Sequence, residues 1–113
     1  MPWKGFVKSD HLMSTITFGA AIEAAKQGKA IARSGWNGKN MYVWMAKGNY
    51  ASDTEAPKVI SSGVNLGLFE VGDKGTVTRM PNLNMKAADG STVTGWLASQ
   101  TDILAEDWQI LEA

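Results

Sequence analysis

The loop from Trp36 to Lys39 combines side chains that can recognise a nucleotide. Trp36 offers a flat ring on which a base can stack, Asn37 both donates and accepts hydrogen bonds, and Lys39 attracts phosphate. Gly38, which has no side chain, lets a ligand approach the backbone closely. The same residues also suit a hairpin loop whose tryptophan covers the edge of a core, so the pattern leaves both interpretations open.

A second tryptophan, Trp96, lies just before a predicted helix start. Ser99 with Asp102 three residues later is typical of a capping box, which predicts a short helix from that point. Free backbone N–H groups at a helix start attract anions, and Thr101 adds a neutral hydrogen-bonding group. Asp102 can accept a hydrogen bond from a ribose hydroxyl or an exocyclic amine. In the alternative interpretation, Ser99 and Asp102 only cap the helix.

Three cations are candidate partners for phosphate: Arg33, Arg79 and Lys86. Arg33 is favoured because it leads directly into the Trp36 loop. A lone surface cation is otherwise simply solvated, and this alternative applies to all three residues.

Three carboxylates near the C-terminus, Asp102, Glu106 and Asp107, could imitate an acid/base pair or a metal site. The alternative places Asp102 at a helix start and the other two in a solvated turn. The chain has no cysteine and one histidine, His11, which excludes thiol catalysis and argues against a histidine-based triad. There is no P-loop and no dinucleotide-binding glycine pattern. We therefore expect no enzyme activity, no cofactor and no metal.

The composition sets further limits on partners. The 113 residues contain 11 basic and 11 acidic side chains, and this balance argues against binding to a nucleic-acid polymer. No apolar run approaches the roughly 20 residues that a membrane span needs. The chain reads as an intracellular protein that contacts no membrane. Its five tryptophans suit either stacking on planar ligands or filling a small core.

The periodicity predicts an α+β fold, with one N-terminal helix packed on an antiparallel β-sheet and a short second helix near the C-terminus. The first helix is expected over 17–28, with Thr17 as N-cap and Gly28 as the left-handed residue that ends it. Asp89-Gly90 predicts a hairpin between two strands. Residues 47–75 are expected to be irregular with one or two short strands. The predicted strands are 29–33, 41–45, 76–80, 83–87, 91–94 and 108–111.

Two parts of the chain resemble the second type of phage Thoeris anti-defence family. The first part joins residues 17–24 to 32–39, which include the Trp-Asn-Gly-Lys motif. The second joins residues 84–90 to 95–108, in which the run Trp-Leu-Ala-Ser-Gln-Thr-Asp is highly specific. The resemblance covers about 17–112. It implies a single domain over 17–113, preceded by an extension over 1–16.

The resemblance implies a sponge that captures the Thoeris signal glyco-cyclic ADP-ribose in the cytoplasm of the infected bacterial host and does not cleave it. Some relatives also bind cyclic di- or trinucleotides of CBASS defence at a separate site. The family assembles as a homotetramer with pockets between subunits, where an aromatic pair grips the adenine. A virion-associated structural protein and, less favoured, a hydrolase of nucleotide signals remain the alternatives. The expected ligand-binding residues are Arg33, Trp36, Asn37, Lys39, Asn84, Trp96, Ser99, Thr101 and Asp102.

Overall fold

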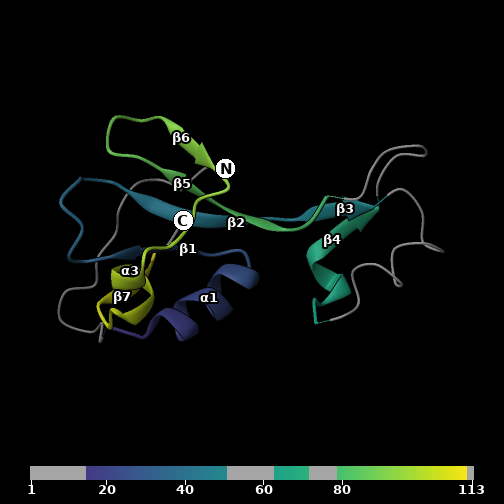
Figure 1. Cartoon of the computed structure of the whole chain (residues 1–113), viewed down its shortest axis with the longest axis horizontal. Helices are drawn as coiled ribbons and strands as arrows, with labels where there is room; N and C mark the ends of the chain where they lie inside the picture. The colour runs from purple at the N-terminus through teal and green to yellow at the C-terminus, as the bar shows by residue number, and fades with distance from the viewer. Residues whose placement is uncertain (1–14, 51–62, 72–78, 112–113) are drawn as a thin grey trace. The chain divides into compact units, whose positions relative to one another are not determined.

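The structure, a computed structural model, describes residues 15–50, 63–71 and 79–111 (Figure 1). Within these ranges it contains two α-helices, one short 3-10 helix and seven strands. In chain order they are α1 (Phe18–Lys26), β1 (Ala30–Arg33), β2 (Tyr42–Ala46), β3 (Gly48–Tyr50), η1 (Leu66–Leu68), β4 (Phe69–Val71), β5 (Asn82–Lys86), β6 (Thr92–Thr94), α3 (Gln100–Leu104) and β7 (Trp108–Leu111).

The described residues divide into two compact units. One comprises the residues up to Met45 and those from Leu83 onward, and the other spans Ala46–Asn82. The first unit carries a five-stranded sheet in the order β6-β5-β2-β1-β7 and both α-helices. β1 pairs antiparallel with β2 and with β7, and β5 pairs antiparallel with β6. The predicted α+β fold with an antiparallel sheet is therefore confirmed.

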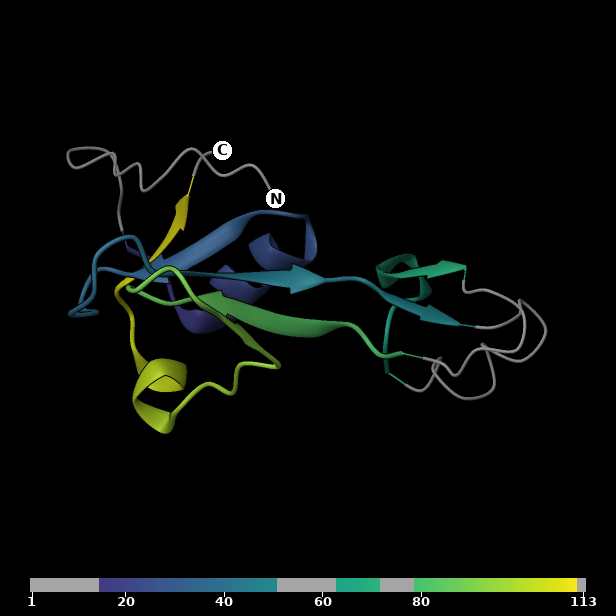
Figure 2. The ribbon, with the colours of Figure 1, turned by 90° about the horizontal axis from the view of Figure 1, so that it is seen from above.

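Helix α1 begins and ends at the signals that the sequence contains. The Thr17 side chain accepts a hydrogen bond from the Ala20 backbone N–H, and Gly28 has φ +95°, which favours glycine after a helix end. Ala21 and Ala25 are buried on the face that packs against the sheet. These small alanine side chains lie in one core cluster with Ile31 and Val43 of the sheet. Figure 2 shows the ribbon turned by 90° from the view of Figure 1.

The core of the first unit lies between α1 and the sheet and centres on Trp108. Trp108 and Ile31 are completely buried, as is Val43 of β2. Along β2 the side chains alternate as predicted, because Val43 packs with Met41 and Met45 in this core while Tyr42 packs on the opposite face of the sheet.

The two predictions for the C-terminal half are also confirmed. β5 and β6 form a hairpin whose turn contains Gly90 at φ +92°. The Ser99 hydroxyl accepts from the Asp102 backbone N–H, and the Asp102 carboxylate accepts from the Ser99 N–H, so the capping box is complete and α3 starts there.

The described part of the second unit contains η1 and a parallel pair of short strands, β3 and β4, and Phe69 is buried there. The one or two short strands expected between residues 47 and 75 are thus present. Most of the strand expected over 76–80 lies outside the described residues. Its last part is described, and Arg79 there forms an isolated bridge with Asn49.

The expected N-terminal extension falls almost wholly outside the described residues. Ile16, which we assigned to that extension, exchanges two backbone hydrogen bonds with Trp108 and so pairs with β7 of the domain. The described helices include none that is long and apolar enough to cross a membrane.

Candidate functional site

Three tryptophans from separate segments meet in and beside the core. Trp36 comes from the loop after β1, Trp96 from the segment before α3, and Trp108 from the start of β7. The ring centroid of Trp36 lies 6.2 Å from that of Trp96 and 5.4 Å from that of Trp108, and both pairs are edge to face. Trp96 and Trp108 are 6.5 Å apart. Edge-to-face pairs are favourable because the positive ring edge meets the negative ring face.

The three rings differ in exposure. Trp108 is fully buried and contacts Phe18 of α1, whereas Trp36 and Trp96 are each half-buried. Trp96 is also anchored by its backbone, since its N–H donates to the Leu83 carbonyl at 2.7 Å. Trp36 and Trp96 therefore pack against the core, and each residue keeps part of its surface exposed to solvent.

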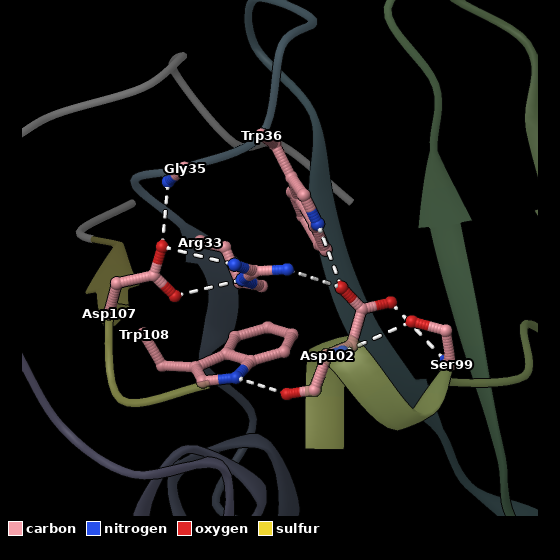
Figure 3. Close-up of polar contacts among 7 residues, drawn as sticks. All are labelled: Arg33, Gly35, Trp36, Ser99, Asp102, Asp107 and Trp108. Carbon is pink, nitrogen blue, oxygen red and sulfur yellow. Dashed lines mark hydrogen bonds and ion pairs between the residues drawn. The ribbon is translucent and has the colours of Figure 1, made fainter. Parts of the chain in front are cut away.

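The Asp102 carboxylate connects the tryptophans to the rest of the site (Figure 3). Its Oδ1 accepts from the Trp36 indole Nε1 at 3.2 Å and from Arg33 Nη1 at 2.8 Å, and its Oδ2 accepts from the Ser99 N–H. The Asp102 backbone carbonyl accepts from the Trp108 indole Nε1 at 2.9 Å. One residue of α3 thus holds two of the three indoles.

Arg33 binds two carboxylates, Asp102 and Asp107, that are both distant from it in the sequence. Its Nε and Nη2 donate to Asp107, at 2.8 and 3.4 Å, in a two-point contact, while Nη1 reaches Asp102. The Gly35 backbone N–H donates to the same Asp107 carboxylate at 2.8 Å. The Arg33 and Asp102 side chains are only 16% and 14% exposed, so this ion pair is shielded from solvent more than a surface pair would be.

The charges in this network stabilise one another. The hydrogen bonds that Arg33 donates to Asp107 and, second, to Asp102 raise the pKa of Arg33. Burial alone would raise the pKa of Asp102, but hydrogen bonds from Arg33, Trp36 and Ser99 outweigh it and the pKa is lowered. The Arg33 hydrogen bond likewise lowers the pKa of Asp107, against the effect of burial. Both carboxylates are therefore held ionised at neutral pH.

The other predicted ligand-binding residues lie around this network in different surroundings. Asn37, Lys39, Ser99 and Thr101 are exposed, and Lys39 forms no ion pair with another described residue. Asn84 is buried, and its Oδ1 accepts from the Gly95 N–H at 3.1 Å, so its amide stabilises the end of the β5–β6 hairpin.

The three carboxylates singled out in the sequence have different surroundings in the structure. Asp102 and Asp107 both bind Arg33, which corrects the expectation that Asp107 lies in a solvated turn, whereas Glu106 is exposed. Across residues 15–50, 63–71 and 79–111, no group of three or more His, Cys, Asp or Glu side chains is arranged to hold a metal ion.

Comparison with known proteins gives a family for this fold and site. The sequence model of the Thoeris anti-defense 2-like domain family matches residues 16–111, which include both tryptophan segments and the Arg33 network. The chain belongs to the Thoeris anti-defense 2-like family. It is 33% identical over 100 residues to the protein named Thoeris anti-defense 2 of Bacillus phage SP01, and the match covers 88% of this chain and 99% of that relative.

In this Thoeris anti-defense 2-like domain, sequence reasoning missed Gly35 and singled out Asp107 without connecting it to Arg33. The signal that identifies them is the strand register, because Arg33 of β1 is paired with Trp108 of β7. That pairing brings Asp107, the neighbour of Trp108, beside the end of β1. The match of the family model also begins at residue 16, which agrees with the pairing of Ile16 to β7.

Proposed function

We propose that this protein is a phage anti-defence sponge, which binds cyclic nucleotide immune signals in the cytoplasm of the infected host and holds them without cleavage. The expected signal is glyco-cyclic ADP-ribose, the messenger of Thoeris defence; cyclic di- or trinucleotides are further candidates. Membership of an anti-defence family supports the general role. The observation that carries the proposal is the half-exposed pair of Trp36 and Trp96, which meet edge to face although they come from distant segments.

A sponge works by mass action, so it must keep the free messenger below the level that activates the host effector. Nanomolar binding corresponds to roughly 12 kcal/mol. Base stacking on an aromatic side chain contributes about 1–3 kcal/mol per base, so the two indoles supply part of that free energy. The remainder must come from hydrogen bonds and from charge contacts to the phosphates.

The surroundings of the two tryptophans indicate which side chains could contact the phosphates and the sugars of the ligand. Arg33 is already bound to Asp102 and Asp107, so the exposed Lys39 in the Trp36 loop is the more available cation for a phosphate. Ser99 and Thr101 are exposed beside α3 and suit the sugar hydroxyls. This assignment needs neither a nucleophile nor a metal.

The proposal includes a homotetramer with ligand sites between subunits. Three large apolar side chains in and beside α3 are exposed in the single chain: Leu97, Ile103 and Leu104, at 89%, 46% and 75%. Apolar side chains clustered in one segment are typical of a subunit contact. A site shared between subunits would also bury more of the ligand than a single exposed loop.

Native mass spectrometry after mixing with a panel of cyclic nucleotides tests the proposal in one experiment. We expect a tetramer that carries intact glyco-cyclic ADP-ribose. A protein that assembles and takes up none of the panel would favour the structural alternative, and a bound or released cleavage product would favour the hydrolase.

A further inference from the structure

We infer that Asp102, supported by Arg33, is a positioning residue that fixes the Trp36 indole for stacking and acts on ligand affinity through that ring. The inference rests on the proposed function, because it concerns how the binding surface is prepared. It assigns Asp102 and Arg33, which the sequence suggested as direct ligand contacts, a role inside the protein.

The Trp36 ring needs such support because the neighbouring side chains of its loop provide little. Residues 34, 35, 37, 39 and 40 of the loop are all exposed, although the loop backbone itself lies close to Asp107 and Ala88. The ring is held instead at its two ends: its faces and edges contact Trp96 and Trp108, and its Nε1 donates to Asp102 Oδ1. The hydrogen bond selects one of the two ways in which the flat ring can occupy this space, because only one edge of an indole carries an N–H.

Asp102 is itself fixed from three directions. The capping box with Ser99 sets its place at the start of α3, and Arg33 Nη1 approaches Oδ1 at 2.8 Å. An ionised carboxylate offers about four acceptor positions, and contacts within the protein occupy three of them here. With 14% of its side chain exposed, Asp102 has little surface left for a ligand.

Arg33 extends this support to the start of the loop. It holds Asp107, which also accepts from the Gly35 N–H, so the backbone next to Trp36 and the helix α3 are both tied to one guanidinium. A ring that is already in its binding orientation loses less conformational entropy when a base stacks on it. The network therefore contributes to affinity without touching the ligand.

A double-mutant cycle tests this inference, with glyco-cyclic ADP-ribose as the probe and calorimetry as the measurement. Trp36→Phe keeps an aromatic ring but removes the N–H donor, and Asp102→Ala removes the acceptor. We expect Asp102→Ala to weaken binding by roughly tenfold to a hundredfold in the wild-type background, the range for a hydrogen bond to a charged group. In the Trp36→Phe background it should have almost no further effect.

Two further variants separate positioning from folding. Ser99→Ala removes the hydroxyl from the same helix cap but keeps the Asp102–Trp36 bond, so its free energy of unfolding, and not its affinity, is compared with that of Asp102→Ala. Asp102→Asn retains an oxygen acceptor and should recover most of the affinity that Asp102→Ala loses. In the free protein, the indole N–H resonance of Trp36, identified by its loss in Trp36→Phe, should shift in Asp102→Ala and stay in place in Ser99→Ala.

The outcomes distinguish the two proposals. Equal losses for Asp102→Ala in both backgrounds would show that Asp102 contacts the ligand directly, and would overturn the inference while leaving the sponge intact. An unchanged Trp36 indole resonance in Asp102→Ala would overturn it as well. A wild-type protein that binds no messenger would overturn the proposed function, and this inference with it.

Discussion

At the scale of single residues, Asp102 explains why one short sequence motif has so many consequences. The same carboxylate completes a helix cap, neutralises Arg33 and holds the Trp36 indole. Its pKa is lowered because these hydrogen bonds outweigh the effect of burial. A carboxyl group that remains ionised and engaged in hydrogen bonds is poorly suited to donate a proton, so Asp102 is a poor candidate for a general acid.

The lowered pKa values of Asp102 and Asp107 predict acid sensitivity. A carboxyl group with a depressed folded-state pKa contributes stability that is present above its unfolded pKa of about 4 and is lost as the pH falls through the folded value. Urea unfolding at a series of pH values should therefore show a free energy of unfolding that declines below about pH 4. Asp107→Asn should decline less steeply over this window, and a slope equal to that of wild type would contradict the role given to Asp107.

Replacing either half-buried tryptophan, Trp36 or Trp96, should remove a stacking surface. We expect Trp36→Ala and Trp96→Ala each to weaken binding of glyco-cyclic ADP-ribose by roughly 5- to 150-fold, the equivalent of one base–aromatic stack. Trp44→Ala is the matched control, because Trp44 is also half-buried but lies beside Tyr42 in β2. Calorimetry measures the affinity, and circular dichroism checks that each variant is folded. Wild-type affinity in both test variants would remove the tryptophans from the site.

Contacts between residues close together in the sequence could be predicted, whereas contacts between distant residues could not. The contact of Ser99 with Asp102 follows a local pattern, so the sequence predicts it. The contact of Arg33 with Asp107 does not, because it requires β1 and β7 to pair in one particular register. Nothing in the residues near Arg33 indicates that register.

At the scale of elements, two positions in the loop after β1 have no room for a side chain and are occupied by glycine. A Cβ on Gly38 would meet the Met41 sulfur and would lie 2.7 Å from the Ala88 Cβ in the β5–β6 turn. A Cβ on Gly35 would lie 2.6 Å from Asp107 Oδ2, the oxygen to which the Gly35 N–H donates. The loop therefore approaches both neighbouring segments too closely for a side chain.

This close approach predicts opposite effects for two glycine substitutions. Gly35→Ala should destabilise the protein by about 1–3 kcal/mol, the typical cost of overpacking. Gly19→Ala should stabilise it by roughly 0.5–1 kcal/mol, because Gly19 lies within α1 and an added Cβ has no neighbour closer than 4.0 Å. Denaturant unfolding of both variants measures the difference. A Gly35→Ala variant as stable as wild type would show that the loop is loosely packed.

Most elements could be predicted because their ends carry local signals. Thr17 and Gly28 delimit α1, and Gly90 marks the β5–β6 turn. The parallel pairing of β3 with β4 could not be predicted, because each strand has only three residues and the partners are separated by a long connection. Such a pairing depends on contacts that leave little trace in either segment.

At the scale of the whole molecule, the exposed apolar residues of the α3 region bear on assembly. We expect Leu97→Asp and Leu104→Asp to produce species smaller than the proposed tetramer, because a buried carboxylate without a partner destabilises an apolar contact. Lys29→Asp, a change at an exposed residue after α1, serves as the control and should leave the assembly unchanged. Native mass spectrometry reports the masses. Wild-type masses for both leucine variants would place the subunit contact elsewhere.

The balanced charge of the chain also matters at this scale. With 11 basic and 11 acidic residues, the chain has no net charge that would attract a polyanion over its whole surface. Under the proposed function, a small charged messenger is therefore held by specific local contacts.

The most direct test of the account is the fate of the messenger itself. Excess protein is mixed with glyco-cyclic ADP-ribose, the unbound fraction is removed by ultrafiltration, and the protein is then heat-denatured so that mass spectrometry can quantify what it releases. The account predicts that the free messenger disappears from the filtrate and is recovered intact after denaturation. Messenger that remains in the filtrate, or that is recovered in cleaved form, would contradict it.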